Sequence, residues 1–194
     1  MYDLGGGDPL AQFTVPSTTT WSIGIDNSAT SPSADPFVIS QGTALGTNNI
    51  MAAATTGEIN YPLQPSFHVY LATDDNDVTG NNTVFFMGDT DIGTALTSRF
   101  DQNSDFTLGA SGGGFFTAPI TGRYYFTFTI RMQQATGANS NGVRIVTSNE
   151  DYRVGSTYTV ASVESFTSNV LADMDAADTA FFGIALNGVG ADTA

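Results

Sequence analysis

Short apolar runs separated by clusters of turn-forming residues constrain the fold of this chain more than any other feature. The 194 residues include 21 Gly, and Ser, Thr, Asn and Asp fill most of the gaps between the runs. Within the runs apolar and polar residues alternate, as in residues 21–25 (WSIGI), which is the period of a half-buried strand. No long stretch repeats apolar residues at helical spacing, so we expect an all-β protein.

The charge of the chain is strongly negative. Nineteen Asp and Glu residues face five basic residues, which gives a net charge of −14. Lysine is absent, and all five cations are arginines: Arg99, Arg123, Arg131, Arg144 and Arg153. A surface of this sign repels phosphate backbones and anionic lipids, so we expect no nucleic-acid partner. No window approaches 18 apolar residues, so we also expect no membrane insertion.

The chain contains no cysteine, which excludes disulfides, thiolate metal sites and cysteine nucleophiles. The first residues carry neither a basic region nor an apolar core, so we expect that they are not a secretory signal peptide. We therefore expect a protein that is assembled inside a cell, works outside it after lysis, and gains its stability from burial between subunits.

Two parts of the chain differ in their apolar content. Residues 1–64 read as a small β-hairpin module for fibre formation or oligomerisation, with strands expected at 11–15, 21–25, 37–40 and 57–61 and a turn at 44–50. Because isolated hairpins are marginally stable in water, we expect partner chains to bury the large apolar residues of this module. These residues are Phe13, Trp21, Phe37 and Leu45.

Residues 65–194 are richer in aromatic strands and have the size of a jelly-roll sandwich. The strands are expected at 67–71, 84–87, 114–117, 124–132, 143–147, 157–162, 166–174 and 179–186. In the longest run Tyr124, Phe126 and Phe128 fall on one face, which we expect to face the core.

Residues 114–128 (GFFTAPITGRYYFTF) resemble a signature of the complement component 1q globular-head family, whose members are relatives of tumour necrosis factor. The matching positions are Phe116, Gly122, Tyr124, Phe126 and Phe128. The resemblance implies a jelly-roll head and a homotrimer. Two features depart from the family pattern: the upstream half of the signature is met only in part, and the family's closing strand is missing. We therefore expect an open edge beside residues 180–186, which a continuation beyond Ala194 or another chain would fill.

A second resemblance covers the first third of the chain. Residues 21–28 (WSIGIDNS), 35–40 (DPFVIS) and 45–49 (LGTNN) are similar to the small β modules of bacteriophage tail-fibre proteins. This resemblance implies a fibrous trimer and a location in the virion.

Few residues are candidates for chemistry. His68, the one histidine, lies in an expected strand without a recognisable nucleophile motif, so we interpret it as structural and expect no catalytic residues. Asp74, Asp75 and Asp77 form the densest carboxylate run and are candidate calcium ligands, although a solvated turn explains them as well. We expect no other cofactor.

The sequence therefore predicts a non-enzymatic, structural and adhesive virion protein: a tail fibre, a spike or a capsid-decorating appendage. It would form a homotrimer with itself, contact other virion proteins, and bind a glycan or a protein on the host surface. Two alternatives stay open: a glycan-degrading enzyme associated with a tail, and a lectin-like head on a bacterial or cellular surface.

Overall fold

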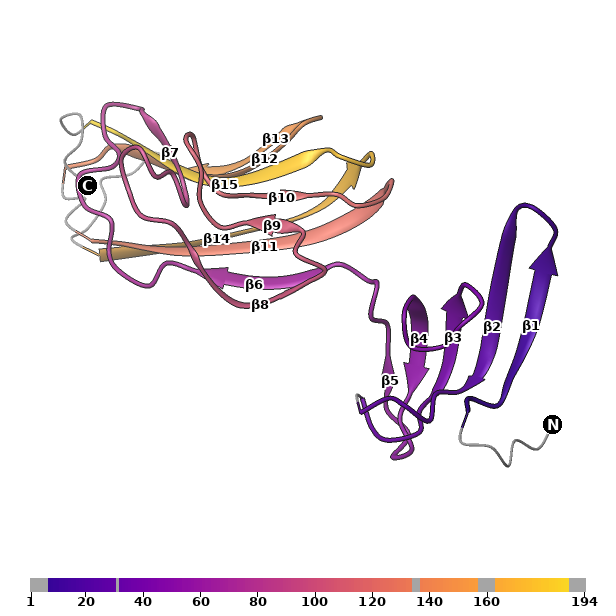
Figure 1. Ribbon diagram of the computed structural model, residues 1–194. Helices are drawn as coiled ribbons and strands as arrows, with labels where there is room; N and C mark the ends of the chain where they lie inside the picture. The colour runs from indigo at the N-terminus through magenta and orange to yellow at the C-terminus, as the bar shows by residue number, and fades with distance from the viewer. Residues whose placement is uncertain (1–6, 31, 134–136, 157–162, 189–194) are drawn as a thin grey trace. The chain divides into compact units, whose positions relative to one another are not determined.

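The computed structural model describes residues 7–30, 32–133, 137–156 and 163–188 (Figure 1). These residues form antiparallel β-sheets, and the described part of the chain contains no helix, hence none that is long and apolar enough to span a membrane. The all-β class predicted from the sequence is confirmed. The chain divides into two compact units, Met1–Ser66 and Phe67–Ala194, two residues after the boundary that the sequence suggested.

The N-terminal unit is a five-stranded antiparallel meander in which each strand pairs with the next along the chain (Figure 1). Its strands are β1 (Leu10–Val15), β2 (Thr19–Ile25), β3 (Phe37–Gln41), β4 (Asn49–Ala53) and β5 (Ile59–Asn60). The sequence analysis missed β4 and expected a turn at 44–50, which overlaps the start of this strand. The reason is that β4 is alanine-rich and has little intrinsic strand preference, so its pairing with β3 decides its conformation.

One face of this sheet holds a thin core. Val38 and Ala52 project from the sheet and pack with Leu45 from the loop after β3, and all three side chains are buried. The same loop is tied down by hydrogen bonds from Ser22 Oγ to the Gly42 carbonyl (2.7 Å) and from Gln12 Nε2 to the Thr43 carbonyl (2.7 Å). The expectation that Leu45 needs a partner chain for its burial is therefore wrong, because its own loop folds it onto the sheet.

The C-terminal unit is built as two layers (Figure 1). One layer is a six-stranded sheet in the order β13-β12-β15-β10-β9, with β7 also paired to β15. The other layer contains two separate pairs, β11-β14 and β6-β8. The strands are β6 (Ser66–Tyr70), β7 (Val84–Phe86), β8 (Thr97–Gln102), β9 (Phe106–Thr107), β10 (Phe115–Thr117), β11 (Gly122–Gln133), β12 (Ser140–Thr147), β13 (Asp151–Ser156), β14 (Val163–Met174) and β15 (Thr179–Asn187).

The β11-β14 pair confirms the register predicted for the longest run. It extends over twelve residues on each strand, from Gly122 opposite Met174 to Gln133 opposite Val163. Phe126 is 4% exposed and Tyr125 is 68% exposed, so successive side chains alternate between the core and the outside. Tyr124 and Phe128 lie on the core side and are half-buried.

Three expectations about the C-terminal unit need correction or fall outside the structure. The strands β8, β9 and β13 were not predicted, whereas the strand expected at 157–162 lies outside the described residues. The predicted open edge beside residues 180–186 is wrong, because β15 is paired on both sides. β12 accompanies it from Ala180 to Asn187, and β10 and β7 share its other edge.

Candidate functional site

A hollow of about 860 Å³ opens into the C-terminal unit between β6 and β11. Its walls are residues 67–71 on one side and residues 127–133 on the other. We call this hollow the β6–β11 groove. Both walls belong to the layer that consists of two separate strand pairs, so the groove lies where that layer is interrupted.

The floor of the groove is the hydrophobic core. Phe85 of β7 and Met87, which directly follows β7, contribute to this floor. Phe182 and Ile184 contribute to it from β15. All four side chains are at most 6% exposed. Phe182 stacks on Phe106 with ring centroids 6.2 Å apart and meets Phe126 and Phe128 edge-on, so aromatic rings pack around the floor. A groove of this kind suits an apolar occupant.

The calcium candidates line part of the groove and belong to the loop that follows β6. Asp74 and Asp77 are exposed, whereas Asp75 is half-buried. Asp75 Oδ1 accepts hydrogen bonds from the backbone N–H (3.0 Å) and the hydroxyl (2.8 Å) of Thr94, and its Oδ2 is buried without a hydrogen-bond partner in the structure. Asp75 therefore fastens its loop to a segment 19 residues further along the chain.

No three His, Cys, Asp or Glu side chains of the described residues are grouped so that they would hold a metal ion. Asp74, Asp75 and Asp77 thus do not converge in this arrangement of the loop. Calcium binding by these three residues stays a prediction, and it would require the exposed carboxylates to turn toward Asp75.

His68 lies in β6 with an exposed side chain, and its ring meets the ring of Phe100 edge-on at 6.1 Å. Beside it, the guanidinium of Arg99 lies 4.7 Å from the centre of the Tyr70 ring. These side-chain contacts join β6 to β8, which is consistent with a structural role for the histidine.

The carboxylate of Asp101 supports the turn between β8 and β9. Asp101 accepts hydrogen bonds from the backbone N–H groups of Asp105 and Phe106, one at each carboxylate oxygen and both at 3.1 Å. Burial, and secondarily the negative charge of Asp101, raise the pKa of Asp105 above its ordinary value. Because both oxygens of Asp101 accept hydrogen bonds from the backbone, Asp101 supports the turn.

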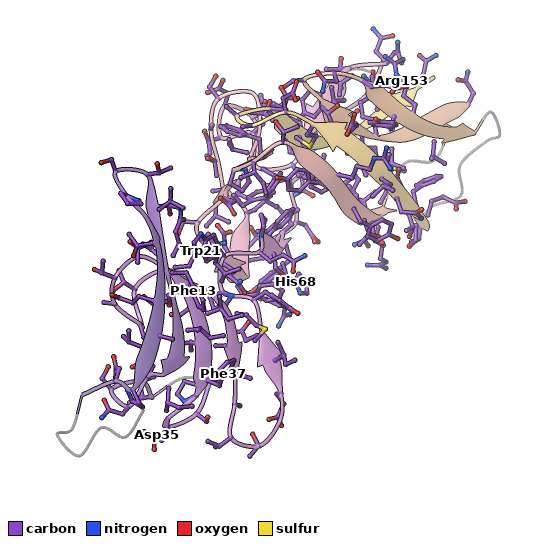
Figure 2. All side chains as sticks on the ribbon, turned by 90° about the vertical axis from the view of Figure 1, so that its right-hand side faces the viewer. Phe13, Trp21, Asp35, Phe37, His68 and Arg153 are labelled. Carbon is purple, nitrogen blue, oxygen red and sulfur yellow. The ribbon has the colours of Figure 1, made fainter. Side chains whose placement is uncertain are left out.

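The N-terminal sheet presents a different kind of surface (Figure 2). Phe13 lies opposite Trp21 on neighbouring strands, and Ile25 lies opposite Phe37, so these side chains share the face away from the buried Val38 and Ala52. Phe13 is 65%, Trp21 37% and Phe37 39% exposed. The sequences of β1 to β5 contain no charged residue. We call this surface the aromatic face.

Sequence reasoning identified the aromatic residues of this face but missed the β6–β11 groove. The groove has no local signal, because its walls come from segments that are far apart in the sequence and its floor comes from β7 and β15. Only the order of the strands within the layer brings these segments together.

Comparisons with models of known protein families and with curated proteins find no match for this chain.

Proposed function

We propose that this chain is a structural and adhesive virion protein: a tail fibre, a spike or a capsid-decorating appendage that assembles as a homotrimer. In this proposal the N-terminal unit joins the chains and contacts other virion proteins. The C-terminal unit is a jelly-roll head that contacts a glycan or a protein on the host surface. The protein works in the virion, outside the cell that makes it.

The aromatic face is the observation that carries this proposal. A unit whose buried apolar core consists of Val38, Leu45 and Ala52 leaves Phe13, Trp21 and Phe37 in contact with water. Covering apolar surface is favourable by about 25 cal/mol per Å², so this face gains stability when another surface covers it. Its lack of charge in a protein of net charge −14 removes the repulsion that would otherwise keep identical chains apart at this point.

The C-terminal unit supports the second half of the proposal. Two layers of short antiparallel strands with a shared aromatic core are the architecture on which many binding heads are built. Two of its loop carboxylates, Asp89 and Asp178, hold the backbone. Asp89 Oδ1 accepts hydrogen bonds from the N–H groups of Asp91 and Gly112, and Asp178 Oδ2 accepts them from Asn149 and from the Asp175 N–H. A role in binding and assembly fits these residues better than acid–base chemistry does.

Light scattering on the purified protein at micromolar concentration tests the assembly. Three chains of 20.3 kDa give about 61 kDa, and this mass is the expected result. A monomeric mass would contradict the proposal.

Substitutions test whether the aromatic face forms the interface. We expect the double variant Phe13→Ser with Trp21→Ser to dissociate to monomers. The matched control is Ile120→Ser in the C-terminal unit, where the isoleucine is also 65% exposed, and we expect it to stay trimeric. If the trimer survives the double substitution, the chains associate through another surface.

Incubation with host polysaccharide separates the adhesive function from the alternative of a glycan-degrading enzyme. We expect retention of the protein on the polysaccharide without shortening of the glycan chains. A steady release of new reducing ends by the pure protein would show that the enzymatic alternative is correct.

A further inference from the structure

The β11-β14 pair exposes one of its two sides along its whole length. On the inward side, Phe126 and Met132 of β11 and Ala172 and Met174 of β14 are buried. Because side chains alternate along a strand, every second residue from 123 to 133 and from 163 to 173 points the other way, and all of these side chains are exposed. We call this side the outer face of the β11-β14 pair. A strand of this length spans about 36 Å.

The outer face combines one apolar platform with a run of neutral polar groups. Tyr125 lies directly opposite Leu171, and their side chains are 68% and 60% exposed, so an aromatic ring and an aliphatic group lie side by side in water. The next positions along the pair carry hydroxyl or amide groups: Thr127, Asn169, Thr129 and Thr167. A sugar ring has an apolar C–H side and a rim of hydroxyls, so it can stack on an aromatic ring while hydroxyl and amide groups bind its rim.

The outer face is also locally basic. Arg123 and Arg131 lie on it, and among the described residues neither of them forms an ion pair. The other three arginines have partners elsewhere, either the carboxylate of Asp151 or the ring of Tyr70: Arg144, Arg153 and Arg99. Asp173, opposite Arg123, is the one acid of the face. Two arginines against one aspartate give the outer face a net charge of +1, in a chain whose net charge is −14.

The spacing of the two arginines indicates an extended ligand with sparse negative charges. Arg123 and Arg131 are eight positions apart on β11, which corresponds to about 26 Å. Small molecules prefer concave sites, whereas this face is a long strip of exposed side chains. A guanidinium binds a carboxylate through paired hydrogen bonds. A nucleic acid fits poorly, because it carries a negative charge about every 1.7 Å of duplex and most of the face is neutral.

We propose that the outer face of the β11-β14 pair binds an acidic polysaccharide, in which carboxylate-bearing sugars alternate with neutral ones. The glycan lies along the strands, with one sugar ring on the platform of Tyr125 and Leu171 and with carboxylates at Arg123 and Arg131. Salt screens the acids elsewhere on the protein, since the Debye length is about 8 Å at physiological ionic strength. The inference rests on the proposed adhesive function and narrows its ligand to this class of glycan.

Retention on immobilised hyaluronate, whose carboxylates lie on alternate sugars, tests the ligand class. We expect the protein to be retained at low salt and released as the salt concentration rises, because salt weakens contacts between charges. The matched control is hyaluronate whose carboxyl groups are methyl-esterified, and it should bind the protein at least about tenfold more weakly. Equal retention on both materials, or no retention on hyaluronate, would overturn the proposal.

Substitutions test whether the outer face is the binding site. Arg131→Gln should weaken retention on hyaluronate about tenfold, because charge-assisted hydrogen bonds are lost. Tyr125→Ala should weaken it about fivefold, because the stacking surface is lost, whereas Tyr125→Phe keeps the ring and should bind like the wild type. Arg153→Gln removes the same charge from β13 in the other layer and should also have no effect. If Arg153→Gln and Arg131→Gln weaken binding equally, or neither does, the glycan is not held on this face.

Light scattering on Tyr125→Ala distinguishes the glycan site from an interface between chains. We expect this variant to keep the mass of the wild-type assembly. A lower mass would show that a second copy covers the outer face, and it would overturn the glycan site while leaving the proposed homotrimer in place. A wild-type protein that is monomeric and still binds hyaluronate through Arg131 would do the reverse, because it would support the glycan site and contradict the trimer.

Discussion

Truncation of Phe126 to alanine is the sharpest test of the core of the C-terminal unit. The side chain is 4% exposed, and its ring meets the rings of Phe116 at 5.4 Å and Phe182 at 5.6 Å, both edge-on. Loss of a buried phenyl group costs its transfer free energy plus the cavity that remains, about 3–5 kcal/mol in protein cores. The edge-on contacts place the expected loss in the upper half of that range, because each such ring pair contributes about 0.5–1.5 kcal/mol.

The assay uses the distribution of aromatic residues between the two units. Trp21 is the one tryptophan of the chain and lies in the N-terminal unit, so its fluorescence reports that unit alone. Unfolding of the C-terminal unit by urea is followed by near-ultraviolet circular dichroism. For Phe126→Ala we expect a lower midpoint of this transition and an unchanged tryptophan transition.

The matched control for this substitution is Tyr125→Ala. Tyr125 is the neighbouring residue on β11 and is 68% exposed, so its truncation should change the free energy of unfolding by less than about 0.5 kcal/mol. If Tyr125→Ala proves the more costly of the two, the register of β11 is shifted by one residue and the assignment of the core face is wrong.

Three further substitutions test local features. Asp105→Asn should raise the melting temperature at pH 7, because the raised pKa of Asp105 means that its ionisation costs native stability as the pH rises; the gain should shrink as the pH falls through this raised pKa and be lost below about pH 4, and a gain that grows on acidification would contradict this reasoning. Asp101→Asn should lower the melting temperature, since it weakens two hydrogen bonds to backbone N–H groups. Gly183→Ala should destabilise the C-terminal unit by about 1–3 kcal/mol, because a Cβ there would lie 2.7 Å from the Phe86 ring and 3.0 Å from the Phe85 carbonyl. Its control Gly142→Ala, where the nearest atom is 3.5 Å away, should be tolerated, and equal losses at both glycines would show that β7 does not pack against β15.

The sequence by itself determined the features that are encoded locally. Alternation of apolar and polar residues fixed the strand class and the inward face of β11, where Phe126 is buried and Tyr125 is exposed. The change in apolar content near residue 65 located the division into two units, which the structure places after Ser66. Both signals depend on neighbours along the chain, and the period of two survives whatever partners the strand finds.

Only the tertiary structure decided which edges are paired and which are open. The sequence suggested a missing neighbour beside residues 180–186, yet β12, β10 and β7 surround β15, whereas among the described strands β6 pairs with β8 alone and β11 with β14 alone. The sequence analysis also expected Leu45 to need a partner chain, and it missed β4. Both outcomes depend on contacts across the sheet: the loop after β3 folds Leu45 onto the sheet, and β4 pairs with β3. Strand order depends on contacts between residues far apart in the chain, and a pattern of period two carries no information about which strands become neighbours.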